Sequence, residues 1–447
     1  MKKYPLLLLL CFFPFFKSPI LLGEKTGGGS RKRIIIMGGG SIGLMSAYFL
    51  VKEGYQVTVI DKAEPASGAS FGNAGFVVPS SAYPLAAPGM VREGLSRMLR
   101  SGNEGIGFQN LHHPQTIRWA WHFWRSGSEK KFKETSELLF SLGQESAQLH
   151  RDISEVLGGD IYQQSGRLEL TRSEEAFESC LNKARRLAEK GISSSKLTPE
   201  TIIADVPHSL PAGNVRGLLY PDDGFIRPYV LLSSLADWLR KNGAVIRSGI
   251  NISDFKKDGN KIRGLWTSEG FIDGDEFLIA AGFESNTLIK KLRARPLSLL
   301  PGAGYSLTIK NNGVKLSRPV MLAENHVALS PLDDNRLRVA GVMVIGDGSP
   351  GIDQSKVEYL KGVVQTWFGH DFWEQNSEYS SWKGHRPCSP DGLPMIGRLK
   401  EYQNLSVATG HCTLGMHFGP VTGRIISSVL SGKPLKPGEE KLKPQRY

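Results

Sequence analysis

The chain has 447 residues, of which 40% are hydrophobic and 22% are charged, so it is long enough for two or three domains and does not have the composition of a disordered protein. Its formal net charge of +12 would suit a nucleic-acid partner, but residues 1–33 contribute +6 and residues 433–447 contribute +3, which leaves +3 for the body of the chain. The basic residues therefore gather in the tails, and we find no basic stripe interleaved with aromatic residues of the kind that binds nucleic acid.

The N-terminal segment starts with Lys2 and Lys3, which precede an apolar run over residues 5–16. This run is shorter than the roughly 20 residues that cross a bilayer. It resembles the core of a signal peptide, although no small-residue cleavage site follows it, and residues 23–32 have the composition of a flexible linker. We interpret residues 1–32 as a signal-like or anchoring extension with its linker, and residues 433–447 as a basic tail.

The first nucleotide motif lies directly after this extension. An apolar strand is predicted over residues 34–37, followed by Gly38, Gly40 and Gly43 in the spacing G-x-G-x-x-G and by a helix over residues 41–53. A second strand over residues 56–60 ends at Asp61, where an acid hydrogen-bonds ribose hydroxyls and repels a 2′-phosphate. The motif therefore predicts a dinucleotide site for NAD or FAD and disfavours NADP.

The next segments favour FAD. A plain NAD domain would begin a second helix soon after Asp61, but this chain continues with a long connection rich in small residues that contains Ser70, Asn73 and Gly75. Further along, a helix (residues 228–241), a strand (244–246), a hairpin-like stretch (261–272) and an apolar strand ending at Gly282 resume the α/β pattern after an insertion.

The insertion and the C-terminal part have patterns of their own. Residues 130–190 are charged and helix-periodic, whereas residues 304–310, 320–332 and 335–346 alternate like antiparallel strands. The aromatic motif RWAWHFW (residues 118–124) predicts a helix that packs its rings into this part, with a membrane- or quinone-facing patch as the alternative. Near the end of the chain, a strand (405–409) leads through Gly410 and Gly415 into a helix over residues 418–430, whose N-terminus would stabilise negative charge on a reduced flavin.

The four cysteines, Cys11, Cys180, Cys388 and Cys412, form no C-x-x-C pair, and no His/Cys cluster has the spacing of a zinc site. The sequence therefore predicts reduced thiols and no bound metal.

These motifs resemble the D-amino-acid oxidase/glycine oxidase superfamily of FAD-dependent enzymes, and within it the bacterial D-amino-acid dehydrogenases. The resemblance spans roughly residues 33–432 and is carried by GGGSIG with Asp61, FGNAGFVVPSSAYPLAAPG, DDGFIRP, LIAAG, GYS, GHRPCSPDGLPMIG and GHCTLGMHFGPVTG. It implies an α/β fold in which a Rossmann-like FAD domain of the glutathione-reductase type is interleaved with an α+β substrate domain built on an antiparallel sheet. The FAD domain is expected to comprise residues 33–110, 204–293 and 382–432, and the substrate domain residues 111–203 and 294–381.

The resemblance also gives candidate site residues. Arg386 is expected to hold a substrate carboxylate through its bidentate fork, Tyr305 to donate its hydroxyl to the same group, and His411 to face the active site or to cap the glycine turn. The residues expected to bind FAD are Gly38, Gly40, Ser41, Ile42, Gly43, Asp61, Lys62, Ser70, Asn73, Ala74, Gly75, Ala281, Gly282, Gly384, Gly410, Thr413, Leu414, Gly415 and Met416.

The function expected from the resemblance is oxidation of the C–N bond of a D-amino acid, with electrons passed to a membrane acceptor. Two alternatives stay open: an oxygen-using oxidase of glycine, sarcosine or proline-type imino acids, and a flavin subunit of a multi-subunit dehydrogenase. The expected partners are a small amino or imino acid and a quinone or oxygen, in the cytoplasm or peripherally on the inner membrane. The oligomeric state is left open.

Overall fold

The computed structural model describes residues 31–84, 86, 105–206, 215–310, 314, 316–333, 335–369 and 371–447. The predicted extension over residues 1–32 thus lies almost entirely outside the described residues. The elements below all belong to one unit, which starts at Lys32 and ends at Tyr447. Among the described residues, no helix is both long and apolar enough to cross a membrane.

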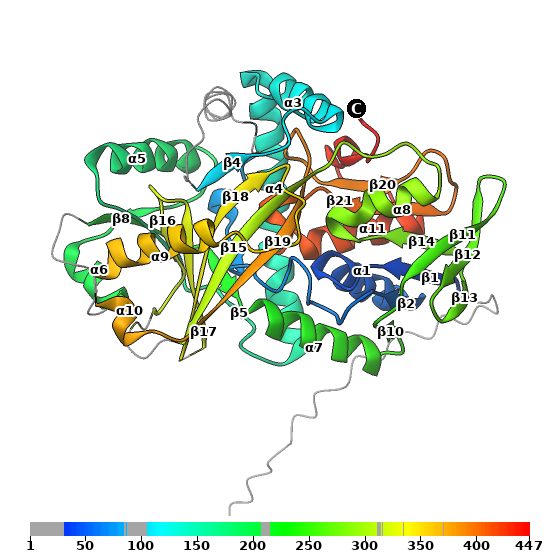
Figure 1. Cartoon of the computed structure of the whole chain (residues 1–447), viewed down its shortest axis with the longest axis horizontal. Coiled ribbons are helices and arrows are strands. Elements are labelled where there is room, and N and C mark those ends of the chain that lie inside the picture. Colours follow the sequence, from blue (N-terminus) through cyan, green and yellow to red (C-terminus); the bar gives the residue numbers. More distant parts are fainter. Residues whose placement is uncertain are drawn as a thin grey trace, which may run out of the picture. The chain divides into compact units, whose positions relative to one another are not determined.

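A mainly parallel sheet occupies the part of the unit that contains the first motif (Figure 1). Its central strand β1 has the sequence RIIIM and is covered on both faces, as expected for a parallel strand. Only the edge strand β20 runs antiparallel to its neighbour. In spatial order the strands are β10 (Val245–Arg247), β2 (Gln56–Ile60), β1 (Arg33–Met37), β14 (Glu276–Ile279), β21 (Leu405–Thr409) and β20 (Met395–Arg398).

Different layers cover the two faces of this sheet. Ile34 and Ile36 of β1 pack into a cluster with helices α1 (Ser41–Lys52), α4 (Glu129–Leu157), α7 (Pro228–Lys241) and α11 (Gly419–Ser431). Ile35 and Met37 point to the other face, because side chains alternate along a strand. That face is covered by α8 (Ser285–Lys291) and by an antiparallel meander of β11 (Ile252–Asp258), β12 (Lys261–Thr267) and β13 (Gly270–Asp273).

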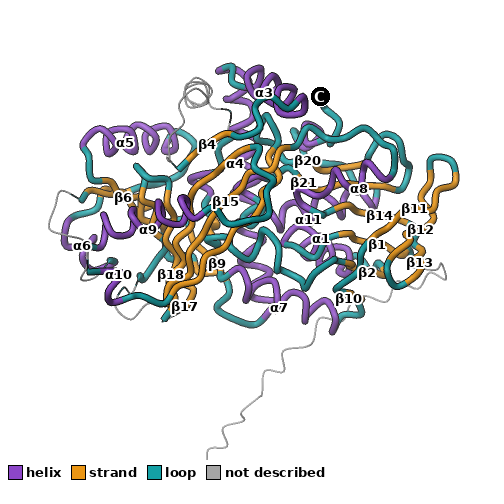
Figure 2. The backbone as a smooth tube through the Cα atoms, in the orientation of Figure 1, coloured by secondary structure: helices purple, strands orange, loops and turns teal. Residues whose placement is uncertain are grey.

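A second, mainly antiparallel sheet forms the other part of the unit, and Figure 2 shows its strands in orange. Its long central strands coincide with the segments in which apolar and polar residues alternate, so the expectation of antiparallel strands there is confirmed. In spatial order the strands are β19 (Tyr379–Cys388), β15 (Leu300–Lys310), β18 (Arg336–Ile345), β17 (Val327–Asp333), β16 (Val320–Leu322), β6 (Arg167–Thr171), β8 (Arg216–Tyr220) and β7 (Ser195–Lys196), with β4 (Ile106–Phe108) beside β18.

Helices from several parts of the chain pack around the second sheet. Helix α9 (Gln354–Phe368) covers one face through Leu360 and Trp367. The other helices are α3 (Pro114–Ser126), α4 (Glu129–Leu157), α5 (Glu174–Ala188), α6 (Pro199–Asp205) and α10 (Phe372–Gln375). The expected substrate-domain segment 111–203, in which residues 130–190 are helix-periodic, also contains β5 (Tyr162–Gln163), β6 and β7. In this segment RLELT forms the strand β6, and the sheet buries all five of its residues. A surface helix would instead leave one of its faces exposed to solvent.

A small sheet connects the two parts, in which β9 (Gly224–Ile226) pairs with β3 (Phe76–Val77) and β5. It places the motif DDGFIRP beside the segment that follows the first nucleotide motif. Strand β8, from the expected FAD segment 204–293, pairs with β6 in the second sheet. The exact residue boundaries of the two expected domains stay a prediction.

Candidate functional site

The turn between β1 and α1 has the geometry that its glycine spacing predicts. Gly38 has a φ of +121°, and a Cβ there would lie 2.4 Å from the carbonyl oxygen of Ala280. A Cβ on Gly43 would lie 1.8 Å from the Gly38 oxygen, so only glycine lets α1 pack this close to the strand. At Gly40, by contrast, the nearest atom is the Ser70 hydroxyl oxygen at 3.5 Å, which leaves this side of the turn open.

Asp61 lies at the end of β2 and closes the turn. One carboxylate oxygen accepts a hydrogen bond from the Gly39 amide at 2.6 Å, and the other accepts one from the Ala63 amide at 3.0 Å. The hydroxyl of Ser41 donates to the Gly415 carbonyl oxygen at 3.2 Å, which joins the first glycine turn to the C-terminal one. Two motifs that are 374 residues apart in the sequence thus meet.

A cavity of about 630 Å³ extends from this junction to the second sheet. Of the expected site residues, it is lined by Gly38, Gly40, Ser41, Ile42, Asp61, Lys62, Ser70, Asn73, Ala281, Gly282, Gly384, Arg386, His411, Gly415 and Met416. The expected residues that do not line it are Gly43, Ala74, Gly75, Tyr305, Gly410, Thr413 and Leu414.

Sequence reasoning missed several lining residues, of which Trp382 is the largest. Its ring lies against the backbone of Gly72 and Gly384, where an added Cβ would approach to 1.9 Å and 1.8 Å. Both glycines belong to the motifs that carry the family resemblance. Neither has a positive φ, and the ring of Trp382 is the reason why a side chain has no room at either position.

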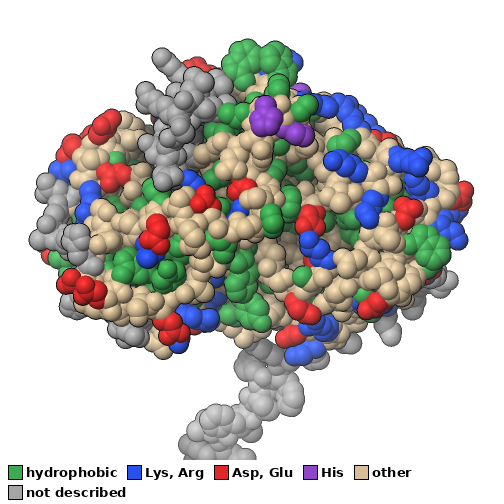
Figure 3. Space-filling model, in the orientation of Figure 1, with side chains coloured by type: hydrophobic (Ala, Val, Ile, Leu, Met, Phe, Trp, Pro, Cys, Tyr) green, Lys and Arg blue, Asp and Glu red, His purple; other side chains and the backbone are tan. Residues whose placement is uncertain are grey.

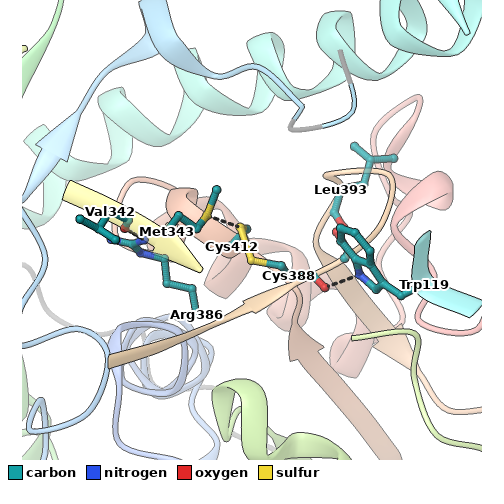
Figure 4. The surroundings of a disulfide bond; sticks show 8 residues. Trp119, Val342, Met343, Arg386, Cys388, Leu393 and Cys412 are labelled. Atoms are coloured by element: carbon teal, nitrogen blue, oxygen red, sulfur yellow. Dashed lines mark hydrogen bonds between the residues drawn. A yellow bond between two sulfur atoms is a disulfide. The ribbon is translucent and has the colours of Figure 1, made fainter. Parts of the chain in front are cut away.

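Arg386 is a cation at the wall of the cavity. It lies on β19, and its Nη1 donates to the Val342 carbonyl oxygen at 3.3 Å (Figure 4). Among the described residues no carboxylate pairs with it, and burial lowers the pKa of its guanidinium to about 10. A Cβ on Gly304 would lie 2.3 Å from the guanidinium carbon, so a glycine in the neighbouring strand makes room for this side chain. This guanidinium is therefore a candidate group for holding an anionic ligand in the cavity.

The comparison with known families agrees with this geometry. A family described as "FAD dependent oxidoreductase" matches residues 33–429. The chain belongs to this family. It is therefore an FAD-dependent oxidoreductase, and its cofactor is FAD, as the sequence predicted.

Curated relatives and solved structures cover most of this oxidoreductase. It is 29% identical over 409 residues to a "D-amino acid dehydrogenase" of Vibrio vulnificus (strain CMCP6), which covers 89% of this chain and 95% of the relative. A "D-amino acid dehydrogenase" of Chromohalobacter salexigens matches with the same identity and coverage.

The fold is shared with solved structures. Glycine oxidase from Geobacillus kaustophilus superposes with a TM-score of 0.74 at 22% identity, over 93% of this chain and 99% of that chain. L-Proline dehydrogenase from P. horikoshii gives 0.70 at 18% identity, over 93% and 97%. These matches confirm the expected α/β fold with its Rossmann-like FAD-binding part.

The residues present fit FAD. The cavity volume lies within the roughly 300–1,000 Å³ of ordinary ligand sites. The open side of Gly40 and the N-terminus of α1 form a cradle of backbone amides for a pyrophosphate.

Tyr305 lies outside the cavity, which contradicts its expected role. The Cβ direction of Gly304 leads to Arg386, and the next side chain on a strand points to the opposite face. Tyr305 is accordingly buried in the apolar cluster under α9, and Lys383 lies 5.6 Å from its ring centroid. Strand alternation therefore separates Tyr305 from Arg386.

His411 lines the cavity but is held by α11. Its Nε2 lies 2.9 Å from the Thr422 hydroxyl, and burial lowers the pKa of the imidazole to about 3. The ring is therefore neutral at physiological pH. The ring makes no side-chain cap at the turn that follows it, and the expected roles of His411 stay predictions.

Cys388 and Cys412 form a disulfide, with their Cα atoms 4.3 Å apart (Figure 4). The expectation of reduced thiols is therefore wrong for this pair, while Cys180 is free and buried. The two cysteines are 24 residues apart and meet because Cys388 pairs with His411 in an isolated β-bridge. The bond ties β19, which carries Arg386, to the turn before α11.

Three buried histidines predict a loss of stability in mild acid. Burial lowers the pKa of His150 to about 4, and those of His411 and His417 to about 3, from the ordinary 6.5. Below about pH 6.5 these histidines are protonated in the unfolded chain but stay neutral in the folded chain. The free energy of unfolding should therefore fall by about 2 kcal/mol per histidine at about pH 5.

Urea unfolding at neutral and mildly acidic pH measures this loss. His417 provides the control, because no polar atom of the described chain bonds either ring nitrogen. His417→Phe should keep the fold and remove about one third of the acid loss. An identical pH slope in the wild type and the variant would contradict the prediction.

Proposed function

We propose that the chain oxidises a free D-amino acid at its Cα–N bond. The observation that carries the proposal is Arg386, a desolvated guanidinium without a carboxylate partner among the described residues, at the wall of a cavity that fits FAD. An amino acid supplies the missing carboxylate. The D configuration is proposed because the curated relatives at 29% identity bear the name D-amino acid dehydrogenase.

The cofactor residues follow from the geometry of the two glycine turns. We assign the ADP half of FAD to Gly38, Gly40, Gly43 and Asp61, where the N-terminus of α1 meets the open side of Gly40. We assign the region of the flavin ring to the small-residue segment around Asn73 and to Gly415 and Met416, which line the same cavity. Bound FAD supplies the acceptor for the hydride that leaves Cα.

The chain itself orients the substrate. The planar guanidinium of Arg386 can make two parallel charge-assisted bonds to the carboxylate, which fixes Cα in the cavity. No strong base is needed if the amine is bound neutral, and His411, with a pKa of about 3, is not one. The imine product hydrolyses in water to a keto acid and ammonia.

We propose a membrane quinone as the electron acceptor, and a location in the cytoplasm or peripherally on the inner membrane. The name dehydrogenase of the relatives supports this choice. An oxygen-using oxidase of glycine or imino acids is the alternative outcome of the experiment below.

The test is anaerobic titration of the purified, yellow protein with D- and L-amino acids, followed by air or a soluble quinone. Bleaching of the flavin by D-amino acids, with reoxidation by quinone and not by air, is the expected result. Bleaching by L-amino acids, glycine, sarcosine or proline alone would refute the proposed substrate. Fast reoxidation by air would refute the proposed acceptor, and a flavin that no amino acid bleaches would point to a subunit without turnover of its own.

Gly40→Val tests the assignment of the pyrophosphate cradle. The apo fold has room for a Cβ at Gly40, so this variant should fold normally but purify without yellow colour, because its side chain fills the cradle. Circular dichroism and the flavin absorbance per protein measure the two effects. Gly351→Val is the control, since nothing lies within 4 Å of a Cβ there and Gly351 does not line the cavity. A yellow Gly40→Val protein would contradict the assignment.

A further inference from the structure

Helix α3 carries the aromatic motif noted in the sequence and presents two apolar stripes. Thr116, Trp119 and Phe123 are buried against the second sheet, as the expectation of inward packing required. The opposite stripe faces solvent: Ile117, Trp121 and Trp124 are 57%, 53% and 55% exposed. Inward packing is therefore wrong for two of the three tryptophans.

The exposed stripe is continuous. Its three residues follow the spacing i, i+4, i+7, which places them on one face of the helix. The rings of Trp121 and Trp124 stack with centroids 5.4 Å apart. Figure 3 shows hydrophobic side chains gathered over α3 at the top of the molecule, beside histidines and basic side chains.

The charges around this stripe are positive. Arg118 and Arg125 are exposed on the same helix, and Arg125 lies 5.8 Å from the Trp121 ring centroid. Helix α3 has no acidic residue. Burial and, after it, the charges of Arg118, Arg125 and Arg295 lower the pKa of His122 on this helix, whereas Asp391, which is ion-paired with Arg446, raises it.

We propose that the outer face of α3 docks this protein onto the surface of an anionic phospholipid bilayer. Tryptophan favours the boundary between headgroups and acyl chains, and arginine is attracted to anionic headgroups. A helix of 13 residues with an apolar stripe and flanking cations lies in the plane of the interface. Charge complementarity favours the anionic bilayer over a second copy of the chain, because two α3 helices in contact would bring their arginines together.

The inner face of α3 connects the docked helix to the cavity. The indole nitrogen of Trp119 donates to the Cys388 carbonyl oxygen at 2.9 Å (Figure 4), and the Gln115 amide donates to the Leu299 oxygen at 2.9 Å. Cys388 is two residues from Arg386 on β19. Docking would thus hold β19, which carries Arg386, close to the membrane. The proposed docking does not depend on which amino acid is oxidised.

The test is flotation of the full chain with phosphatidylcholine vesicles that contain or lack phosphatidylglycerol. The wild type should float with the anionic vesicles and lose binding at high salt. Ile117→Ser/Trp121→Ser/Trp124→Ser should lower the partition coefficient by about tenfold or more. Arg118→Gln/Arg125→Gln should lower it by about 30-fold, since each basic residue at an anionic surface contributes about fivefold. The second variant leaves all apolar side chains in place and keeps the test valid if the first fails to fold.

Trp266→Ser/Phe271→Ser is the matched control, because this exposed aromatic pair lies on β12 and β13, with ring centroids 4.9 Å apart. It should bind vesicles as the wild type does. Flotation of both α3 variants at the wild-type level, as expected if residues 1–32 carry the binding, would overturn the proposal. So would a wild type that does not float, or a dimer that the α3 substitutions dissociate.

Discussion

Arg386→Ala is expected to raise the KM for a D-amino acid by about 30-fold to several thousand-fold while FAD stays bound, since losing one partner of a desolvated charge pair costs about 2–5 kcal/mol. Arg386→Lys keeps the charge but loses the planar fork, so its KM should fall between the two. No described carboxylate contacts Arg386, so neither change leaves a buried anion unpaired in the free enzyme.

Steady-state kinetics with an artificial acceptor measure this effect, and the flavin absorbance per protein controls for loss of cofactor. An amine that lacks the carboxylate serves as the internal control, because its slow oxidation should be insensitive to both substitutions. Wild-type KM values for amino acids in both variants would show that Arg386 is structural and that another group holds the carboxylate.

Asp223→Asn is expected to destabilise the protein by about 3–5 kcal/mol, because it removes the carboxylate that is hydrogen-bonded to the buried Arg167. Arg167 Nε donates to Asp223 at 2.9 Å, and both side chains are about 1% exposed. Asp223 also accepts hydrogen bonds from the amide and the hydroxyl of Ser80. Glu169, which pairs with Lys183, adds a second acid beside Arg167 at 3.8 Å.

Urea unfolding followed by circular dichroism measures this loss of stability. Asp222→Asn is the matched control, because the adjacent Asp222 is exposed and its substitution should change stability by less than about 0.5 kcal/mol. Equal stabilities of the two variants would show that Arg167 finds another partner when Asp223 is neutral. The yellow colour should survive in both variants, since neither residue lines the cavity.

The unit from β1 to β2 could be predicted from the sequence almost to the residue. Strand β2 and helix α7 have the predicted bounds, and α1 ends one residue earlier than expected. These elements are specified by short-range signals, namely apolar runs, a helical period and glycines that only one turn geometry allows. Short strands such as β6 were missed, because burial of both faces removes the alternation that identifies a strand.

The sequence by itself thus determined the family and the cofactor, because the motifs that carry them are local, and it singled out Arg386 as a candidate for the substrate carboxylate. Only the tertiary structure decided which side chains meet. It turned Tyr305 away from Arg386, joined Cys388 to Cys412 and paired Arg167 with Asp223 across 56 residues. It also left one stripe of α3 exposed, although both stripes are aromatic in the sequence. Such contacts depend on strand alternation and on the packing of distant segments, and no local pattern of residues encodes either.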